Sequence, residues 1–134
     1  MALFQLGDFK LHSGATSRWK IDCDALTPDD WAALAVMAVE MLPPFGSVEG
    51  VPRGGLKFAK ALKPYCTTGP LLIVDDVTTT GASLNEHLGK RQARGCVVFC
   101  RGVCPPWVIP LFRMPESYRD QMTAAPYWTR RTVS

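Results

Sequence analysis

The chain has 134 residues, 47% of them hydrophobic and 20% charged, and its formal net charge is +3. This length and balance are typical of one globular domain, so we expect residues 1–134 to form a single domain. No apolar run is long enough to span a membrane, and the N-terminus lacks the basic and long apolar regions of a signal peptide. We therefore expect a cytoplasmic protein without a membrane partner. The mild positive charge suits a phosphorylated ligand, and nucleic acid is not an expected partner.

The five cysteines are an odd number, which argues against a closed disulfide framework. Cys96, Cys100 and Cys104 are evenly spaced, but a strand would place the first two about 13 Å apart. A single metal ion or cluster needs thiolates within a few ångströms of each other. We interpret these cysteines as small buried core residues in a reducing compartment.

The N-terminal part of the chain predicts a two-stranded hairpin followed by a helix. We place the hairpin at 9–24, because apolar and polar side chains alternate over its second half. Thr27 then offers a hydroxyl N-cap, with Pro28 at the first helical position and two acidic residues behind it. The helix runs to Leu42, and because it is apolar nearly all round, we expect it to be largely buried.

Strands and helices alternate beyond this point. We expect strands at 47–51, 71–74, 96–100 and 107–112, and helices at 56–62 and 83–94, the second of them capped by Gly95. Recurrent prolines forbid long helices after residue 105 and predict an irregular tail at 113–134. The order of elements predicts right-handed βαβ units, and hence an α/β fold with a mainly parallel central sheet flanked by helices.

The most informative stretch is 71–83, which reads Leu-Leu-Ile-Val-Asp-Asp-Val-Thr-Thr-Thr-Gly-Ala-Ser. Four aliphatic residues predict a strand buried on both faces, and ligands of open α/β sheets bind at the carboxyl ends of such strands. Asp75 and Asp76 follow the strand, and a turn rich in hydroxyls and free N–H groups follows them. The acidic pair and the turn cannot hold the same anion. Together they predict a ligand with a phosphate at one end and hydroxyls or a chelated metal at the other, as in a sugar phosphate.

The acidic pair has two other interpretations. A receiver domain of a response regulator also carries paired acids at a strand end, but it needs a further aspartate and a lysine at later strand ends. After Asp76 the only aspartate is Asp120, in the proline-rich tail, and no lysine follows Lys90. The remaining alternative is purely structural, with acids ending a strand and threonines in an ordinary turn.

Residues 71–83 closely resemble the diphosphoribosyl-binding signature of type I phosphoribosyltransferases. The resemblance implies that Asp75 and Asp76 hold the ribose hydroxyls, and that Mg²⁺ contacts this pair indirectly, through those hydroxyls or water. It also implies that the following loop binds the substrate 5-phosphate, with these members: Val77, Thr78, Thr79, Thr80, Gly81, Ala82 and Ser83. Ala82 departs from the more usual glycine or threonine, but its backbone N–H is retained.

Residues 50–55, Gly-Val-Pro-Arg-Gly-Gly, lie between a predicted strand and a predicted helix, so their amides can face an anion. Their position one βαβ step before the acidic pair resembles the pyrophosphate loop of the same family. The resemblance implies that Pro52, Arg53 and Gly54 contact pyrophosphate, Arg53 through charge-assisted hydrogen bonds. The alternative is a solvated arginine in a tight turn.

Residues 9–24 resemble the hood of orotate phosphoribosyltransferases through a Ser-Gly-x-x-Ser core at 13–17. The resemblance implies that His12 and Lys20 contact the base. His12 stands where those enzymes have lysine, and Lys20 and Ile21 stand where they have aromatic residues, so orotate is not the assured base. The long mobile loop of the orotate enzymes is missing, since only 62–70 fill that interval. A small lid, a partner subunit, or binding without turnover would each account for its absence.

The resemblance implies a fold and a function. We expect a type I phosphoribosyltransferase-like fold with a small hood-like segment, and transfer of ribose 5-phosphate from phosphoribosyl pyrophosphate to a nitrogenous base. Asp75, Asp76 and Arg53 would be the catalytic residues, Mg²⁺ the cofactor, and a homodimer the assembly. The alternative is a non-catalytic protein of the same fold that binds phosphoribosyl pyrophosphate or a nucleotide. A nucleic-acid interface through Arg130 and Arg131 is disfavoured, because no basic stripe accompanies them.

Overall fold

The computed structural model describes residues 1–11 and 14–114. A four-stranded parallel sheet has the order β3-β4-β5-β6. Its strands are β3 (Ser47–Gly50), β4 (Leu71–Thr78), β5 (Arg94–Cys100) and β6 (Val108–Arg113). The helices are α1 (Pro28–Met41), α2 (Leu56–Leu62) and α3 (Ala82–Leu88). The parallel α/β architecture expected from the alternation of elements is confirmed.

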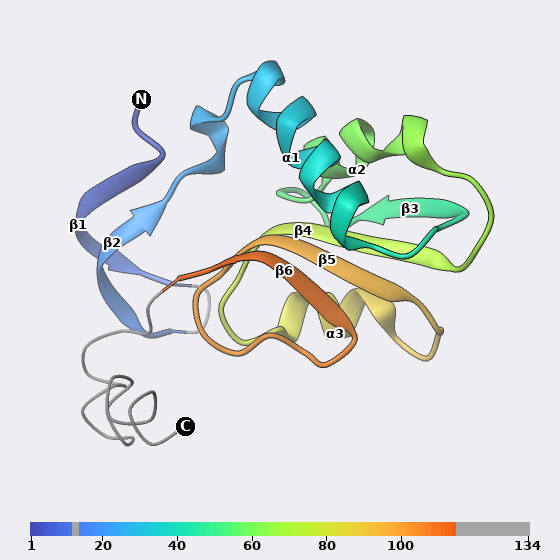
Figure 1. Cartoon of the computed structure of the whole chain (residues 1–134). Helices are drawn as coiled ribbons and strands as arrows, with labels where there is room; N and C mark the ends of the chain where they lie inside the picture. The colour runs from blue at the N-terminus through green and yellow to red at the C-terminus, as the bar shows by residue number, and fades with distance from the viewer. Residues whose placement is uncertain (12–13, 115–134) are drawn as a thin grey trace, which may run out of the picture.

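Helices cover both faces of the sheet, with α1 and α2 on one face and α3 on the other (Figure 1). Successive residues of β4 supply the two cores because strand side chains alternate between faces. Leu72 and Val74 pack in the cluster that contains α1 and α2, whereas Ile73 packs with Leu84 of α3. Burial on both faces explains why this strand is a continuous aliphatic run.

The N-terminal hairpin joins β1 (Phe4–Lys10) to β2 (Thr16–Ile21) in an antiparallel pair. The expected range of 9–24 was wrong at both ends, because β1 starts earlier and a 3-10 turn, Cys23–Ala25, follows β2. In Figure 1 the hairpin lies beside one end of the parallel sheet. The hairpin forms a two-stranded sheet of its own, separate from the parallel sheet.

α1 begins as the sequence predicts but is less buried. The Thr27 hydroxyl accepts the N–H of Asp30, and the Asp30 carboxylate accepts the N–H of Thr27. Leu34 and Ala38 are buried, but Val36 and Met37 are more than 40% exposed. The expectation of a largely buried helix was wrong, because α1 packs against the sheet with one face only.

The segment after β4 differs from expectation in two places. α3 ends at Leu88, with Gly89 in the left-handed region at φ 60°, so Gly95 is not its cap and instead lies within β5. β4 itself continues through the acidic pair to Thr78. The strand expected near 107–112 is present as β6, which extends to Arg113. The irregular tail was expected at 113–134, but Arg113 belongs to β6, and residues 115–134 lie outside the described residues. No helix in the described part of the chain is long and apolar enough to cross a bilayer.

Candidate functional site

The candidate site is built on the loops that follow β3 and β4. Residues 50–55, here named the arginine loop, are held against β4 by a hydrogen bond from Val51 N–H to Val74 O of 2.8 Å. The loop closes with a 2.8 Å bond from Gly55 N–H to Val51 O, and its Pro52–Arg53 peptide bond is cis. Arg53 is exposed, so its guanidinium is accessible to a ligand.

Gly54 brings the arginine loop into contact with the acidic pair. A Cβ atom built on Gly54 would lie 2.5 Å from both carboxylate oxygens of Asp76, closer than any side chain tolerates. Any larger residue at 54 would displace the Asp76 carboxylate, so residues 54 and 76 share one small volume at the sheet end. The two motifs that the sequence predicts separately form one site.

The acidic pair differs in burial. Asp75 is 6% exposed, whereas Asp76 is half-buried. The Asp75 carboxylate accepts the Asp76 N–H at 2.8 Å, and the Asp76 carboxylate accepts the Val77 N–H at 2.7 Å. Burial raises the pKa of Asp75 to about 8, and a hydrogen bond with Asp76 and its negative charge add to the rise. The ligand-free pair therefore holds a proton to a higher pH than an exposed carboxylate does.

Residues 77–83, here named the threonine loop, turn the chain from β4 into α3. The buried Thr78 hydroxyl accepts the N–H of Gly81 at 3.0 Å, and the Thr80 hydroxyl accepts the N–H of Ala82 at 3.2 Å. Gly81 has a φ of 81°, the left-handed region that glycine enters without strain. Thr80, Ala82 and Ser83 are exposed, so the loop presents hydroxyls and backbone to a ligand beside the acidic pair.

The segment after β5 supports the threonine loop from the side. Arg101 N–H donates to Thr78 O at 2.8 Å, and Val103 N–H donates to Thr79 O at 2.9 Å. The Arg101 guanidinium then reaches the hairpin, where it donates to Ser17 Oγ at 2.8 Å and to Trp19 O at 3.2 Å. It also lies over the Trp19 ring, 3.5 Å from the centroid. Arg101 is half-buried, and burial lowers its pKa.

Two residues beside the site were missed in the sequence. Arg101 had a usable signal, because it directly follows a buried strand and the carboxyl ends of parallel strands meet at one edge. Cys23 had none. Its buried thiol faces Asp76, and burial, followed by the negative charge of Asp76, raises its pKa to about 12, so this cysteine is a neutral thiol.

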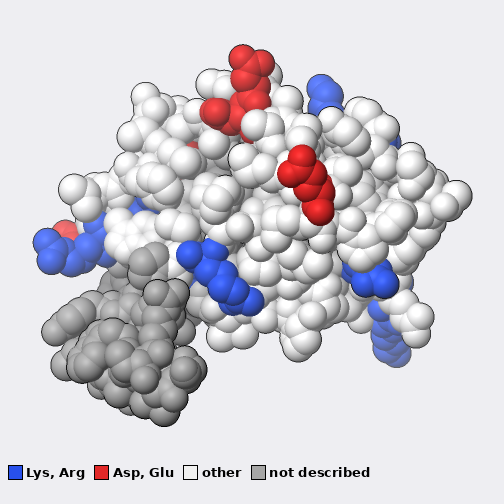
Figure 2. Space-filling view, viewed as in Figure 1, with Lys and Arg blue, Asp and Glu red and all other residues white. Residues whose placement is uncertain are grey.

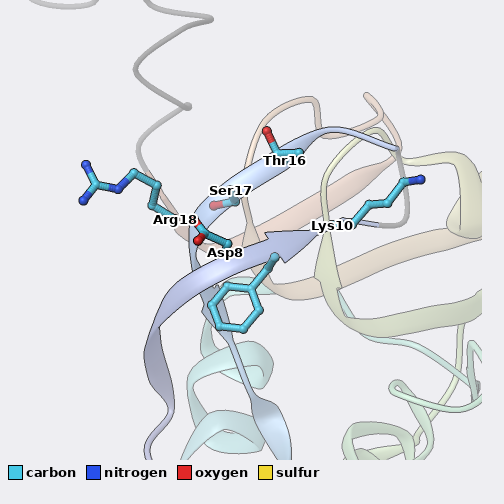
Figure 3. A pocket seen from close by; sticks show the side chains of 6 residues that line it. Asp8, Lys10, Thr16, Ser17 and Arg18 are labelled. Carbon is cyan, nitrogen blue, oxygen red and sulfur yellow. The ribbon is translucent and has the colours of Figure 1, made fainter.

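The hairpin residues expected to contact the base are placed only in part. His12 lies outside the described residues. The Lys20 ammonium lies over the Phe9 ring, 4.8 Å from its centroid. A hairpin cavity of about 480 Å³ is lined by Asp8, Phe9, Lys10, Thr16, Ser17 and Arg18. In Figure 3 Arg18 and Lys10 point away on opposite sides, with Asp8 and Ser17 between them.

Residues 62–70, the short interval between α2 and β4, lie at the end of the sheet opposite the acidic pair. Thr67 N–H donates to Phe45 O at 2.8 Å, and Gly46 N–H donates to Pro70 O at 3.0 Å. These bonds hold 62–70 at the amino end of the sheet, where Ser47 pairs with Leu71. The site is at the carboxyl end, so the possibility that 62–70 act as a small lid is wrong.

The donor set fits Mg²⁺ only together with a ligand. Among residues 1–11 and 14–114, no group of three or more His, Cys, Asp or Glu side chains is placed to hold a metal ion. Asp75 and Asp76 supply carboxylates, which Mg²⁺ prefers, but it keeps several further oxygens in its shell. Substrate oxygens and water would have to complete that shell. The cysteines among the described residues are all free thiols.

Comparison with known proteins gives the fold. The chain matches no protein-family model and no curated protein sequence. Among solved structures it resembles orotate phosphoribosyltransferase from Aeropyrum pernix, with a TM-score of 0.68 and 21% identity over 84% of this chain and 88% of the other. Its fold is that of the orotate phosphoribosyltransferases.

Two further structures agree with this assignment. The orotate phosphoribosyltransferase of Mycobacterium tuberculosis H37Rv, solved with Fe(III) dicitrate, has a TM-score of 0.60 and 16% identity over 83% of this chain and 89% of the other. Leishmania donovani UMP synthase has a TM-score of 0.61 and 22% identity, covering 74% of this chain but 29% of its own. The structural similarity establishes a phosphoribosyltransferase-like fold. The sequence identities are too low to establish the activity, which is therefore a matter for proposal.

Proposed function

We propose that this protein is a phosphoribosyltransferase that uses phosphoribosyl pyrophosphate and a nitrogenous base to form a nucleoside monophosphate and pyrophosphate. The observation that carries the proposal is the convergence of the arginine loop, the acidic pair and the threonine loop at one end of a phosphoribosyltransferase-like sheet. Gly54 touches Asp76, and Asp76 is followed directly by the threonine loop. The three parts match the three parts of the substrate, which are pyrophosphate, ribose and 5-phosphate.

Each part has a role in binding. Hydroxyls and amides of Thr78, Thr79, Thr80, Gly81, Ala82 and Ser83 hold the 5-phosphate, with Val77 leading into the loop. Asp75 and Asp76 accept hydrogen bonds from the ribose hydroxyls. Pro52, Arg53 and Gly54 surround the pyrophosphate, where the Arg53 cation forms charge-assisted bonds. His12 and Lys20 would contact the base. Mg²⁺, when bound with the substrate, neutralises charge on the leaving group.

The proposed reaction is a displacement at the ribose C1 carbon. The C1–O bond to pyrophosphate breaks and its electron pair leaves with pyrophosphate, while a ring nitrogen of the base forms the new C1–N bond. Positive charge develops on the ribose as the bond breaks. The acidic pair stabilises this charge more strongly once Asp75 is ionised, which is electrostatic stabilisation of the transition state. Arg53 stabilises the departing pyrophosphate in the same way.

A matched pair of variants tests this proposal. Asp76→Asn should weaken Mg²⁺-dependent binding of phosphoribosyl pyrophosphate at least about tenfold, since a ribose-binding charge is lost. Asp29→Asn, at the exposed start of α1, should leave binding unchanged. Isothermal titration calorimetry measures both. Pyrophosphate release with Mg²⁺ and a panel of bases then tests turnover, and failure of the wild type to bind the diphosphate would contradict the proposal.

A non-catalytic binding protein of the same fold is the second candidate. The position of 62–70 favours it, because this segment, with Lys63, is held at the opposite end of the sheet and cannot exclude water from the site. Tight Mg²⁺-dependent binding without turnover of any base would select this candidate. For either function we propose a cytoplasmic location, with which the free thiols are consistent. We also propose that the protein is a homodimer.

A further inference from the structure

Arg101 contacts both the threonine loop and the N-terminal hairpin. Its backbone N–H donates to Thr78 O, at the start of the threonine loop. Next to it, a Cβ atom on Gly102 would lie 2.7 Å from Thr79 O, so this segment lies directly against the loop. A displacement of the threonine loop therefore has to move the backbone of residue 101.

The side chain of Arg101 reaches the N-terminal hairpin. Hydrogen bonds join its guanidinium to Ser17 Oγ at 2.8 Å and to Trp19 O at 3.2 Å, across 84 and 82 residues of sequence. The guanidinium plane also covers the Trp19 ring at 3.5 Å. Two hydrogen bonds and one stacked ring thus join β2 to the carboxyl end of β5 through a single side chain.

The guanidinium has no acidic partner in the described part of the chain. The ion pairs found there are made by Lys57, His87 and Arg91. A half-buried cation is costly to desolvate unless hydrogen bonds and an aromatic face replace water, and the hairpin supplies both. Lysine cannot reproduce this arrangement, because its ammonium lacks the planar fork and stacks poorly.

We propose that Arg101 is a positioning residue that holds the N-terminal hairpin beside the site and couples it to the threonine loop. Arg101 thereby places the hairpin beside the threonine loop, at the carboxyl end of the sheet. The positioning role stands without any ligand. The coupling rests on the proposed function, because it can be measured only when a phosphorylated ligand binds at the threonine loop.

The ligand-free protein tests the positioning role. In protein labelled with 5-fluorotryptophan, the four tryptophans of the chain give separate ¹⁹F resonances, and Trp19→Phe identifies that of Trp19. Arg101→Lys keeps the charge but should move the Trp19 resonance toward its position in urea and leave the Trp31 resonance in place. Trypsin should cut after Arg18 and Lys20 at least about fivefold faster in this variant, because the hairpin opens more often.

Arg94→Lys is the matched control, since it makes the same change at the exposed start of β5. Arg94→Lys should leave both the Trp19 resonance and the rate of trypsin cleavage at their wild-type values. If Arg101→Lys does not fold, Arg101→Gln, which keeps a planar amide donor but loses the cation over Trp19, should shift the Trp19 resonance and the trypsin cleavage rate in the same direction. Equal readouts for Arg101→Lys and Arg94→Lys would overturn the proposal.

Ribose 5-phosphate tests the coupling. In the wild type it should shift the Trp19 resonance as the threonine loop fills. In Arg101→Lys it should bind within about threefold of the wild-type affinity, because the loop is intact, while the Trp19 resonance no longer responds. A Trp19 response that persists in Arg101→Lys overturns the coupling. No binding of ribose 5-phosphate to the wild type counts against the proposed function, and the ligand-free comparison still decides the positioning role.

Discussion

At the scale of single residues, the fold imposes a large electrostatic cost on Asp75. Burial and the adjoining Asp76 raise the pKa of this carboxyl to about 8, whereas the unfolded chain titrates near the ordinary value. Between about pH 4 and pH 8 the folded state therefore binds more protons than the unfolded state, and stability falls as the pH rises through this window. A ligand that needs the ionised pair must remove this proton.

Asp75→Asn cannot ionise and should escape that loss. Relative to the wild type, its free energy of unfolding should rise by about 3 to 4 kcal/mol more at pH 8 than at pH 5. Urea unfolding of both proteins at the two pH values measures this double difference. Asp29→Asn controls for loss of an exposed carboxylate. Parallel pH profiles for Asp75→Asn and the wild type would show that the fold does not hold the proton.

At the scale of elements, local chemistry predicts where α1 starts. Thr27→Ala removes the hydroxyl that accepts the Asp30 N–H at 3.1 Å, and the free energy of unfolding should fall by about 1 kcal/mol. Thr67→Ala, an exposed threonine outside the helices, should change it by less than about 0.5 kcal/mol. Chemical denaturation gives both values. Equal losses would mean that the capping box does not stabilise α1.

The same locality explains what the sequence predicted and what it missed. The strand at 71–74, the acidic pair and the cap at Thr27 depend on neighbours within a few residues, and the structure contains them. The end of α3 was misplaced because Gly89 and Gly95 are both plausible caps, and only the pairing of β5 with β4 decides between them. Arg101 could have been found from its place directly after β5, but its contacts with Ser17 and Trp19 join residues far apart in the chain, and Cys23 had no local signal at all.

At the scale of the whole molecule, the described residues 1–11 and 14–114 leave an apolar groove exposed. A groove of about 580 Å³ lies between α1, β1 and the sheet edge formed by β6, and its lining includes Phe4, Met37 and Phe112. These side chains are 52%, 41% and 41% exposed, and Phe112 stacks on Phe99 with ring centroids 5.6 Å apart. In Figure 2 charged side chains are scattered over the visible face of the molecule. An open apolar groove beside an edge strand suits a second copy of the chain.

We therefore expect the homodimer to form across this groove, and Met37 and Val36 test it as adjacent residues of α1. Met37→Lys places a charge in the groove without removing core packing and should convert a dimer to a monomer. Val36→Lys carries the same charge at a residue 44% exposed that does not line the groove, and should leave the dimer intact. Sedimentation velocity across a range of concentrations distinguishes the two species. A wild-type monomer at every concentration contradicts the assembly, and dissociation by both variants contradicts its placement, because only a broader interface would include Val36.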